Sequence, residues 1–250
     1  MPLNVAWGIT GAGHLLLESF KAMSEVKERR GAKIAAFLSS AGYECVRMYG
    51  LWESLGEISK KIYVERGASA PRAGPLSTGL YDLFVVSPAT ANTVAKIVVG
   101  IADSLVTNAF AQAQKGETPI FVVPTDQELG AVTTTLPFRV DRGECREFRF
   151  FLSCRECEAQ RACKDGAIEV GESARIDLLK CSGCGDCVQA CPYGAVKFGE
   201  KIDIKIRQID VENVERLREM KGVTVLKRPE GIPRAVETLI AMKAELGERG

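Results

Sequence analysis

The chain alternates short, continuously apolar runs with longer stretches in which apolar residues recur every three or four positions. Continuous apolar runs are typical of strands buried on both faces, and the wider spacing is typical of helices packed on one face. The predicted strands cover 3–9, 33–38, 81–86 and 120–123, and the predicted helices cover 14–23, 91–99 and 103–114. This alternation predicts an α/β fold with a doubly wound parallel sheet.

The pattern breaks at about residue 138 and returns near residue 209, where it predicts a helix over 211–220, a strand over 222–226 and a final helix over 233–246. An insertion at a surface loop costs its host little when the two ends of the loop lie close together. We therefore expect one domain formed by 1–137 and 209–250, with residues 138–208 inserted as a second, α+β domain.

The inserted segment contains the clearest motif of the chain. Cys181, Cys184, Cys187 and Cys191 read C-x2-C-x2-C-x3-C and are followed by Pro192. This is the spacing with which bacterial ferredoxins hold [4Fe–4S] clusters. A zinc knot is the weaker alternative, since zinc sites rarely need four thiolates spaced in this form.

A second, degenerate copy of the motif lies upstream. Cys154, Cys157 and Cys163 read C-x2-C-x5-C, and both copies are followed by a Gly-Ala-Ile or Gly-Ala-Val tail, at 166–168 and 194–196. The shared tail indicates an internal duplication in which each half is a cysteine loop, a short helix and a strand. The segment is therefore predicted to be a bacterial-type 2[4Fe–4S] ferredoxin domain.

In a duplicated ferredoxin, the fourth cysteine of each half binds the cluster of the other half. One cluster is then expected on Cys163, Cys181, Cys184 and Cys187, and the second on Cys154, Cys157 and Cys191. The second set is one ligand short, and Cys145 is the spare cysteine that would complete two [4Fe–4S] clusters. A three-iron or labile cluster at this second set is the alternative.

Eight of the nine cysteines fall between 145 and 191, which argues against a secreted disulfide protein. The ninth, Cys45, is predicted to be a buried, inert thiol in a strand or at a strand edge. The chain shows no signal peptide and no apolar run long enough to span a membrane, so we expect a cytoplasmic protein without a membrane partner. A net charge of +1, without a basic stripe, argues against nucleic acid as a partner.

Small, polar and glycine-rich turns follow the predicted strands. The first turn contains Gly11 and Gly13, the second begins with Ser39 and Ser40, and the third covers 87–93. Glycines let a backbone approach an anion at a helix N-terminus, and small residues leave room for a flat ring. The first turn lacks the G-x-G-x-x-G order of nicotinamide sites. These turns predict a flavin site, with an ordinary helix cap as the alternative for 87–93.

The stretch Ser87-Pro88-Ala89-Thr90-Ala91-Asn92-Thr93-Val94-Ala95-Lys96, followed by Gly100-Ile101-Ala102-Asp103-Ser104-Leu105, closely resembles the flavin motif of the homo-oligomeric flavin-containing Cys decarboxylase superfamily. The opening Gly8-Ile9-Thr10-Gly11 resembles the start of the same superfamily. The resemblance covers about residues 3–135. It implies a Rossmann or flavodoxin-like flavoprotein that binds FMN and assembles as a trimer or a multiple of trimers.

By this resemblance, FMN would contact residues of the first turn, the second and third turns and the start of the helix after 102. The implied contacts are Thr10, Gly11, Ala12, Gly13, His14, Ser39, Ser40, Ser87, Pro88, Ala89, Thr90, Asn92, Asp103 and Ser104. For His14, the single histidine, a ligand contact, a proton-transfer role and simple packing on a neighbouring loop all stay open.

The departures from the superfamily matter equally. Decarboxylating members carry a histidine after the second strand and a P-x-M-N-x-x-M-W clamp after the fourth, whereas this chain reads Pro124-Thr125-Asp126-Gln127-Glu128-Leu129 there. Decarboxylation of a cysteinyl peptide is therefore not expected. The ferredoxin domain points instead to a branch of archaeal iron-flavoproteins that includes acceptor-type dihydromethanopterin reductases.

These parts predict an iron–sulfur flavoprotein oxidoreductase. Clusters transfer single electrons, and a flavin accepts one or two, so the pair can couple a ferredoxin-like donor to a small-molecule acceptor. The resemblance implies a pterin such as dihydromethanopterin as the acceptor. An electron carrier without an organic substrate is the alternative, and a redox or iron sensor with structural clusters is a third interpretation.

Overall fold

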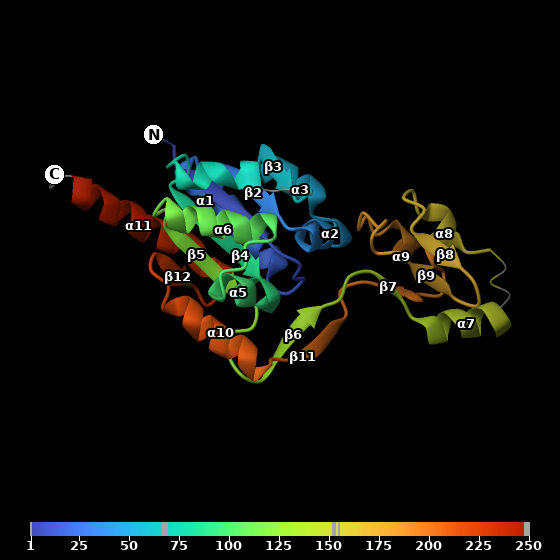
Figure 1. The fold of residues 1–250 in the computed structure, drawn as a ribbon. Coiled ribbons are helices and arrows are strands. Elements are labelled where there is room, and N and C mark those ends of the chain that lie inside the picture. The colour runs from blue at the N-terminus through green and yellow to red at the C-terminus, as the bar shows by residue number, and fades with distance from the viewer. Residues whose placement is uncertain (1, 67–69, 152–153, 155, 248–250) are drawn as a thin grey trace. The chain divides into compact units, whose positions relative to one another are not determined.

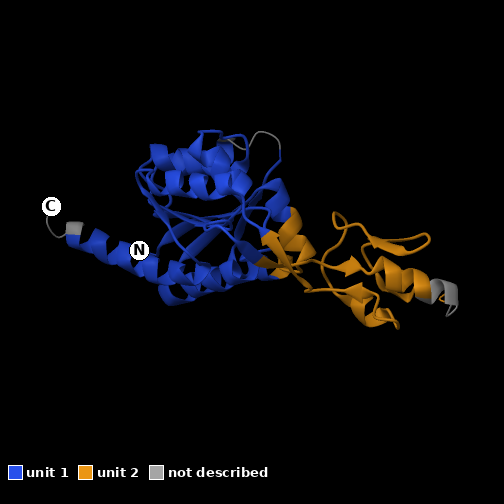
Figure 2. Ribbon diagram, turned by 90° about the horizontal axis from the view of Figure 1, so that it is seen from below, with its two compact units in different colours: residues 1–43, 54–132, 205–250 blue, residues 44–53, 133–204 orange. Residues whose placement is uncertain are grey.

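The computed structural model describes residues 2–66, 70–151, 154 and 156–247. The chain divides into two compact units, shown in Figure 2. Unit 1 comprises 1–43, 54–132 and 205–250, and unit 2 comprises 44–53 and 133–204. The boundaries lie a few residues before those expected at 138 and 208, and unit 2 also includes the segment 44–53, which the sequence pattern did not assign to it.

Unit 1 is built on a six-stranded sheet in which every strand pairing is parallel (Figure 1). The strands lie in the order β3 (Lys61–Val64), β2 (Lys33–Leu38), β1 (Asn4–Ile9), β4 (Leu83–Ala89), β5 (Ile120–Pro124) and β12 (Val223–Val225). The chain order reverses between β1 and β4. In doubly wound sheets, ligands bind at such a reversal, beyond the carboxyl ends of the strands.

The helices of unit 1 connect these strands. They are α1 (Leu16–Arg30), α2 (Ser40–Met48), α3 (Trp52–Ile58), α4 (Ala70–Ala73), α5 (Ala91–Val98), α6 (Leu105–Lys115), α10 (Gln208–Arg218) and α11 (Ile232–Gly247), with 3-10 turns at Gly74–Ser77 and Pro229–Gly231. Helices α2 and α3 extend into the segment 44–53, which is grouped with unit 2. The predicted α/β class and the parallel sheet are confirmed.

Several predicted boundaries were wrong for identifiable reasons. Strand β3 was missed because it is an edge strand whose side chains are only partly buried, so it lacks a continuous apolar run. The first helix begins at Leu16 and not at His14, because Leu15 adopts a left-handed conformation with φ 62°. Cys45 lies on α2 and not in a strand.

The core of unit 1 lies on both faces of the central strands. Trp7, Phe37 and Phe84 are completely buried, and the rings of Phe37 and Phe84 meet edge to face with centroids 6.4 Å apart. Burial of one such side chain stabilises the fold by about 1.5–3 kcal/mol. The apolar runs recognised in the sequence are thus the strands that form this core.

Among the residues that the structure describes, unit 2 contains three complete helices and short pairs of strands. The helices are α7 (Arg142–Phe151), α8 (Glu158–Ala162) and α9 (Asp186–Ala190). The strands are β6 (Ala131–Thr135) paired with β11 (Lys201–Lys205), β7 (Arg139–Val140) with β10 (Val196–Lys197), and β8 (Ile168–Val170) with β9 (Ala174–Ile176). A small core that includes Phe138, Ile168, Val196 and several cysteines fills the centre.

The predicted duplication is visible in unit 2. Helices α8 and α9 are both five residues long, and each ends at a cysteine, Cys163 or Cys191, in the same extended conformation. Three residues later, Gly166 and Gly194 have φ angles of 61° and 67°, which favour glycine. The two halves therefore repeat one loop, helix and turn, and the prediction of an internal repeat is confirmed.

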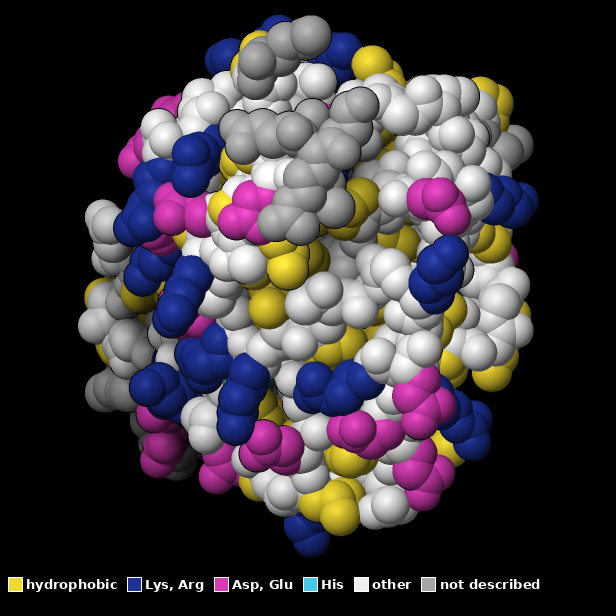
Figure 3. Space-filling view, turned by 90° about the vertical axis from the view of Figure 1, so that its left-hand side faces the viewer, with side chains coloured by type: hydrophobic (Ala, Val, Ile, Leu, Met, Phe, Trp, Pro, Cys, Tyr) yellow, Lys and Arg dark blue, Asp and Glu magenta, His cyan; other side chains and the backbone are white. Residues whose placement is uncertain are grey.

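Within the residues that the structure describes, no helix combines the length and apolar character needed to cross a membrane. On the face drawn in Figure 3, lysine and arginine side chains are interspersed with aspartate and glutamate. This mixture agrees with the net charge of +1.

Candidate functional site

The carboxyl ends of β1 and β4 are tied together through Thr10. Its hydroxyl donates to the carbonyl of Pro88 at 2.7 Å and accepts from the backbone N–H of Thr90 at 2.9 Å. Its own N–H also donates to Pro88, at 3.3 Å. The turn after β1 and the turn after β4, both predicted from sequence, therefore form one structure at the reversal point of the sheet.

Ser87, Pro88 and Ala89 belong to β4 and are buried, whereas the sequence placed them in a turn after the strand. The Ser87 hydroxyl hydrogen-bonds the Ser19 hydroxyl of α1 at 2.7 Å, and the Ser87 carbonyl accepts from Trp7 Nε1 at 3.0 Å. The side chain of Ser87 thus has partners in the interior, and it fixes β4 against α1.

The first turn packs closely on the start of α2. A Cβ added to Gly11 would lie 2.5 Å from the Cβ of Ala41, and one added to Gly42 would lie 2.2 Å from the carbonyl oxygen of Ile9. The Ser39 hydroxyl accepts from the Gly42 N–H at 3.0 Å. Only glycine fits at these two positions. Gly11, which was predicted to let the backbone approach an anion, is thus also needed for close packing of the first turn on α2.

Glu65 is a site residue that the sequence did not reveal. It follows β3, and its carboxylate accepts from the Ser40 hydroxyl at 3.0 Å and from the Leu105 N–H at 2.7 Å. A carboxylate at a helix N-terminus is stabilised by the helix dipole. Glu65 therefore connects the turn after β2 with the first turn of α6.

The remaining predicted contacts fall into two groups. Ala12, Gly13 and His14 lie half-buried in the first turn, and Asn92 is exposed at the start of α5. Thr90 and Ser104 serve as N-caps: Thr90 accepts from the Thr93 N–H at 3.3 Å, and Ser104 forms a capping box with Thr107.

Asp103 lies just before α6 and pairs with Lys96 at 2.8 Å. The Lys96 hydrogen bond holds the pKa of the Asp103 carboxyl below its usual range. The structure thus gives Asp103 and Ser104 local partners at this helix start.

In unit 2, the first expected set of cysteine ligands is brought together. Burial raises the pKa of the Cys187 thiol to about 11, and the neighbouring Cys181, Cys184 and Cys163 raise it further in that order. Burial also raises the pKa of Cys181, where Cys184 and Cys163 again act in the same direction. Without iron, this environment favours protonated thiols, so cluster ligation has to displace those protons.

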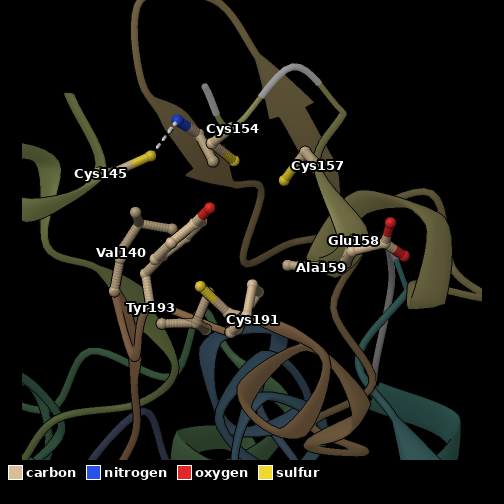
Figure 4. A pocket seen from close by; sticks show the side chains of 12 residues that line it. Val140, Cys145, Cys154, Cys157, Glu158, Ala159, Cys191 and Tyr193 are labelled. Atoms are coloured by element: carbon tan, nitrogen blue, oxygen red, sulfur yellow. Dashed lines mark hydrogen bonds between the residues drawn. The ribbon is translucent and has the colours of Figure 1, made fainter. Parts of the chain in front are cut away.

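The second expected set surrounds an apolar pocket, shown in Figure 4. Cys145 from α7, Cys154, Cys157 and Cys191 all line it, and their sulfur atoms point toward the same space. The aromatic ring of Tyr193 and the side chain of Val140 lie along the wall beside them. The structure therefore places Cys145, which belongs to neither copy of the motif, among the three cysteines that lacked a fourth.

Backbone N–H groups donate to cysteine sulfur atoms of both expected ligand sets. Ala174 donates to Cys145 Sγ at 3.3 Å, Ala167 to Cys163 Sγ at 3.3 Å, and Gly183 to Cys181 Sγ at 3.4 Å. Hydrogen bonds of this kind tune the reduction potential of clusters that are held by cysteine. Among the described residues, no three side chains of His, Cys, Asp or Glu are grouped so as to hold a single metal ion.

The position of Cys145 is fixed by a polar network at the start of α7. The Asp141 side chain accepts from the Glu144 N–H at 3.1 Å, and the Asp141 carbonyl accepts from the Cys145 N–H at 2.9 Å. Lys197, on β10, lies 2.9 Å from Glu144 Oε1 and 3.5 Å from Asp141 Oδ2. Lys197 thereby connects the strand after Cys191 with the helix that carries Cys145.

Comparison with known proteins gives matches to both parts of the chain. Residues 2–130 match the family described as Flavoprotein, and residues 174–197 match the 4Fe-4S binding domain. The chain is 43% identical over 239 residues to dihydromethanopterin reductase (acceptor) of Methanosarcina mazei, covering 92% of this chain and 97% of the relative. It is 45% identical over 236 residues to the enzyme of the same name from Methanocaldococcus jannaschii, covering 91% and 93%.

Among solved structures, DmrB of Burkholderia xenovorans in complex with FMN, described as a cubic protein cage for redox transfer, is similar with a TM-score of 0.57. That similarity covers 99% of this chain and 95% of DmrB at 26% identity. The family match covers more than half of the chain, and two relatives match nearly its whole length. The chain therefore belongs to the flavoprotein family, as a dihydromethanopterin reductase-like member that carries a 4Fe-4S binding domain.

Proposed function

We propose that this protein is an oxidoreductase that uses FMN and two [4Fe–4S] clusters to reduce a small-molecule acceptor with electrons from a ferredoxin-like carrier. The observation that supports the proposal is that four cysteines of unit 2 line one pocket and that Cys163, Cys181 and Cys184 lie near enough to Cys187 to raise its pKa, in a chain that matches the flavoprotein family. Two clusters and a flavin in one protein can accept electrons one at a time from a carrier and deliver them in pairs to an acceptor.

The first unit fits FMN. The turns after β1, β2 and β4 lie at the carboxyl edge of the sheet, and Thr10 connects two of them at the reversal point. The first turn offers backbone groups at Gly11, a position that packs against Ala41 and accepts only glycine. In this assignment the FMN contacts are the residues implied by the resemblance. Ser87 contributes indirectly, because its hydrogen bond to Ser19 holds β4 against α1.

The second unit fits two clusters, because six of its cysteines form or contact a small apolar core, and four cysteines, Cys154 among them, line one pocket. Cys163, Cys181, Cys184 and Cys187 hold one cluster, and Cys145, Cys154, Cys157 and Cys191 hold the other. The chemistry supplied by the bound groups is transfer of single electrons by the clusters and of one or two by the flavin. The chain itself supplies the thiolates, the N–H donors to sulfur and the apolar surroundings that exclude water.

Unit 1 is assigned here as the FMN-binding domain and unit 2 as the inserted iron–sulfur domain. The acceptor assigned is dihydromethanopterin, supported by 43% and 45% identity to reductases of that name over more than nine-tenths of the chain. The same proposal includes assembly as a homo-oligomer, either a trimer or a multiple of trimers. The similar DmrB is described as a cubic cage. The expected cytoplasmic location stays a prediction.

The proposal is tested by a single-turnover reaction without oxygen. Protein reduced with dithionite and freed of excess reductant is mixed with dihydromethanopterin, and the flavin absorbance near 450 nm is followed. We expect rapid flavin reoxidation with formation of tetrahydromethanopterin. A reduced flavin that survives for minutes in excess pterin, yet is reoxidised by an oxidised ferredoxin, would replace this proposal with that of an electron carrier without an organic substrate.

A further inference from the structure

A groove of unit 2 is lined by residues that directly neighbour, in the chain, those of the pocket of Cys145. It has a volume of about 400 Å³, and its walls are formed by α7 and by the connection from β8 to β9. Arg142 and Arg146 line it from α7, and Ser173 and Arg175 line it from the other wall. None of these residues is a ligand in either set of cysteines.

The groove carries positive charge that the chain does not neutralise. Two carboxylates also line it, but Glu172 pairs with Arg146 at 3.3 Å and Glu169 pairs with Lys180 at 3.7 Å. Arg142 and Arg175 are exposed, and neither makes an ion pair with any residue that the structure describes. Two guanidinium groups are thus available to carboxylates of another molecule.

The groove and the cysteine pocket share a wall one residue thick. Ser173 lines the groove, and the next residue, Ala174, lines the pocket and donates its N–H to Cys145 Sγ at 3.3 Å. On the opposite wall, Arg146 follows Cys145 directly in the chain. A molecule seated in the groove is therefore separated from a cluster ligand by one peptide group and one hydrogen bond.

Resting on the proposed function, we infer that this groove is the docking surface for an acidic one-electron carrier protein. In each encounter the reduced carrier would lose one electron, and the cluster that Cys145, Cys154, Cys157 and Cys191 would hold would gain it. Two encounters would supply the two electrons that a bound flavin can accept. Complementary charge of this kind speeds association by roughly 10- to 1000-fold, and salt screens it.

The test compares the cluster reduction rate in two charge-reversed forms of the anaerobic, cluster-loaded protein. The variant R142E/R175E reverses the groove, and R216E/R234E reverses two exposed arginines of unit 1 as a matched control. Reduced acidic 2[4Fe–4S] ferredoxin is the donor in stopped-flow measurements. We expect the second-order rate constant to fall about tenfold or more for R142E/R175E at low ionic strength, to stay unchanged for the control, and to converge at high salt.

Two further readouts keep the inference separate from the proposed function. Reduction by dithionite and the iron content should stay unchanged, and the neutral variant R142Q/R175Q should show an intermediate rate. A wild-type rate with ferredoxin in R142E/R175E would overturn the docking surface, as would an equal slowing with dithionite, which would mean that the arginines act on the cluster itself. The stopped-flow measurement follows cluster absorbance and contains no pterin. The docking surface can therefore be tested even if the protein does not reduce dihydromethanopterin.

Discussion

Cys145 is a thiol outside both copies of the motif that shares a pocket with three cysteines of those copies. It lies nine residues before Cys154, yet it lines the same pocket as Cys154, Cys157 and Cys191 and receives the N–H of Ala174. The number of cysteines in the sequence suggested a ligand role for Cys145. The structure adds that Cys145 lies on α7 with its side chain at the pocket.

Replacing Cys145 therefore has a specific expected outcome. C145A should lower the iron content from about eight to about four per chain, or leave a three-iron cluster with its own electron paramagnetic resonance signal. FMN content should not change, and C45A serves as the control because Cys45 belongs to neither set. Full iron and an unchanged spectrum in C145A would contradict the assignment of the fourth ligand.

Cys45 itself predicts a pH dependence of stability. Burial raises its pKa from 9.0 to about 11, and the charge of Glu44 acts in the same direction. Between these values the folded state keeps a proton that the unfolded state releases, so this contribution is complete below pH 9 and is lost toward pH 11. It amounts to at most about 2–3 kcal/mol.

Urea unfolding at pH 8 and pH 10.5 measures this contribution. The free energy of unfolding of the wild type should fall more between these pH values than that of C45A at equal cluster content. Parallel losses in the two proteins would show that the thiol keeps an ordinary pKa and is accessible to water.

At the scale of elements, helix α7 depends on contacts that link it to the strand after the second motif. Lys197 on β10 bonds Glu144 in the first turn of α7 and Asp141 just before that helix, and Glu144 is the largest cause of the raised pKa of Lys197. The network is only partly buried, so it contributes little to global stability. Its expected effect is local, on the position of Cys145.

The variant K197M tests this positioning role. We expect one of the two clusters to lose iron several-fold faster in air, while FMN content and the other cluster stay as in the wild type. K201M is the matched control, since Lys201 is an exposed lysine of the neighbouring strand β11. Equal iron loss in K197M, K201M and the wild type would show that Lys197 does not position Cys145.

The elements also show what the sequence could and could not reveal. Apolar runs predicted β1, β2, β4 and β5 because these strands are buried on both faces, and the cysteine spacing predicted both halves of the duplicated module. Strand β3 lacks such a run, and Glu65 after it makes its contacts with Ser40 and Leu105, 25 and 40 residues away. Contacts of this range depend on the order of strands in the sheet, which no local pattern contains.

At the scale of the whole molecule, two units with different chemistry occur in one chain. The sheet of unit 1 reverses its chain order between β1 and β4, where the predicted flavin turns meet. In unit 2, cysteines form part of the small apolar core, and four cysteines line one pocket. Family membership and near full-length identity to dihydromethanopterin reductases agree with this division.

A reductive titration of the anaerobic protein, followed by absorbance and electron paramagnetic resonance, would test whether one chain holds two clusters and FMN. One electron for each of two clusters and two for FMN require about four electrons per chain. We expect this value, with two distinguishable cluster signals in addition to the flavin signal. An end point near three electrons with one cluster signal, or near two with no flavin bleaching, would contradict it.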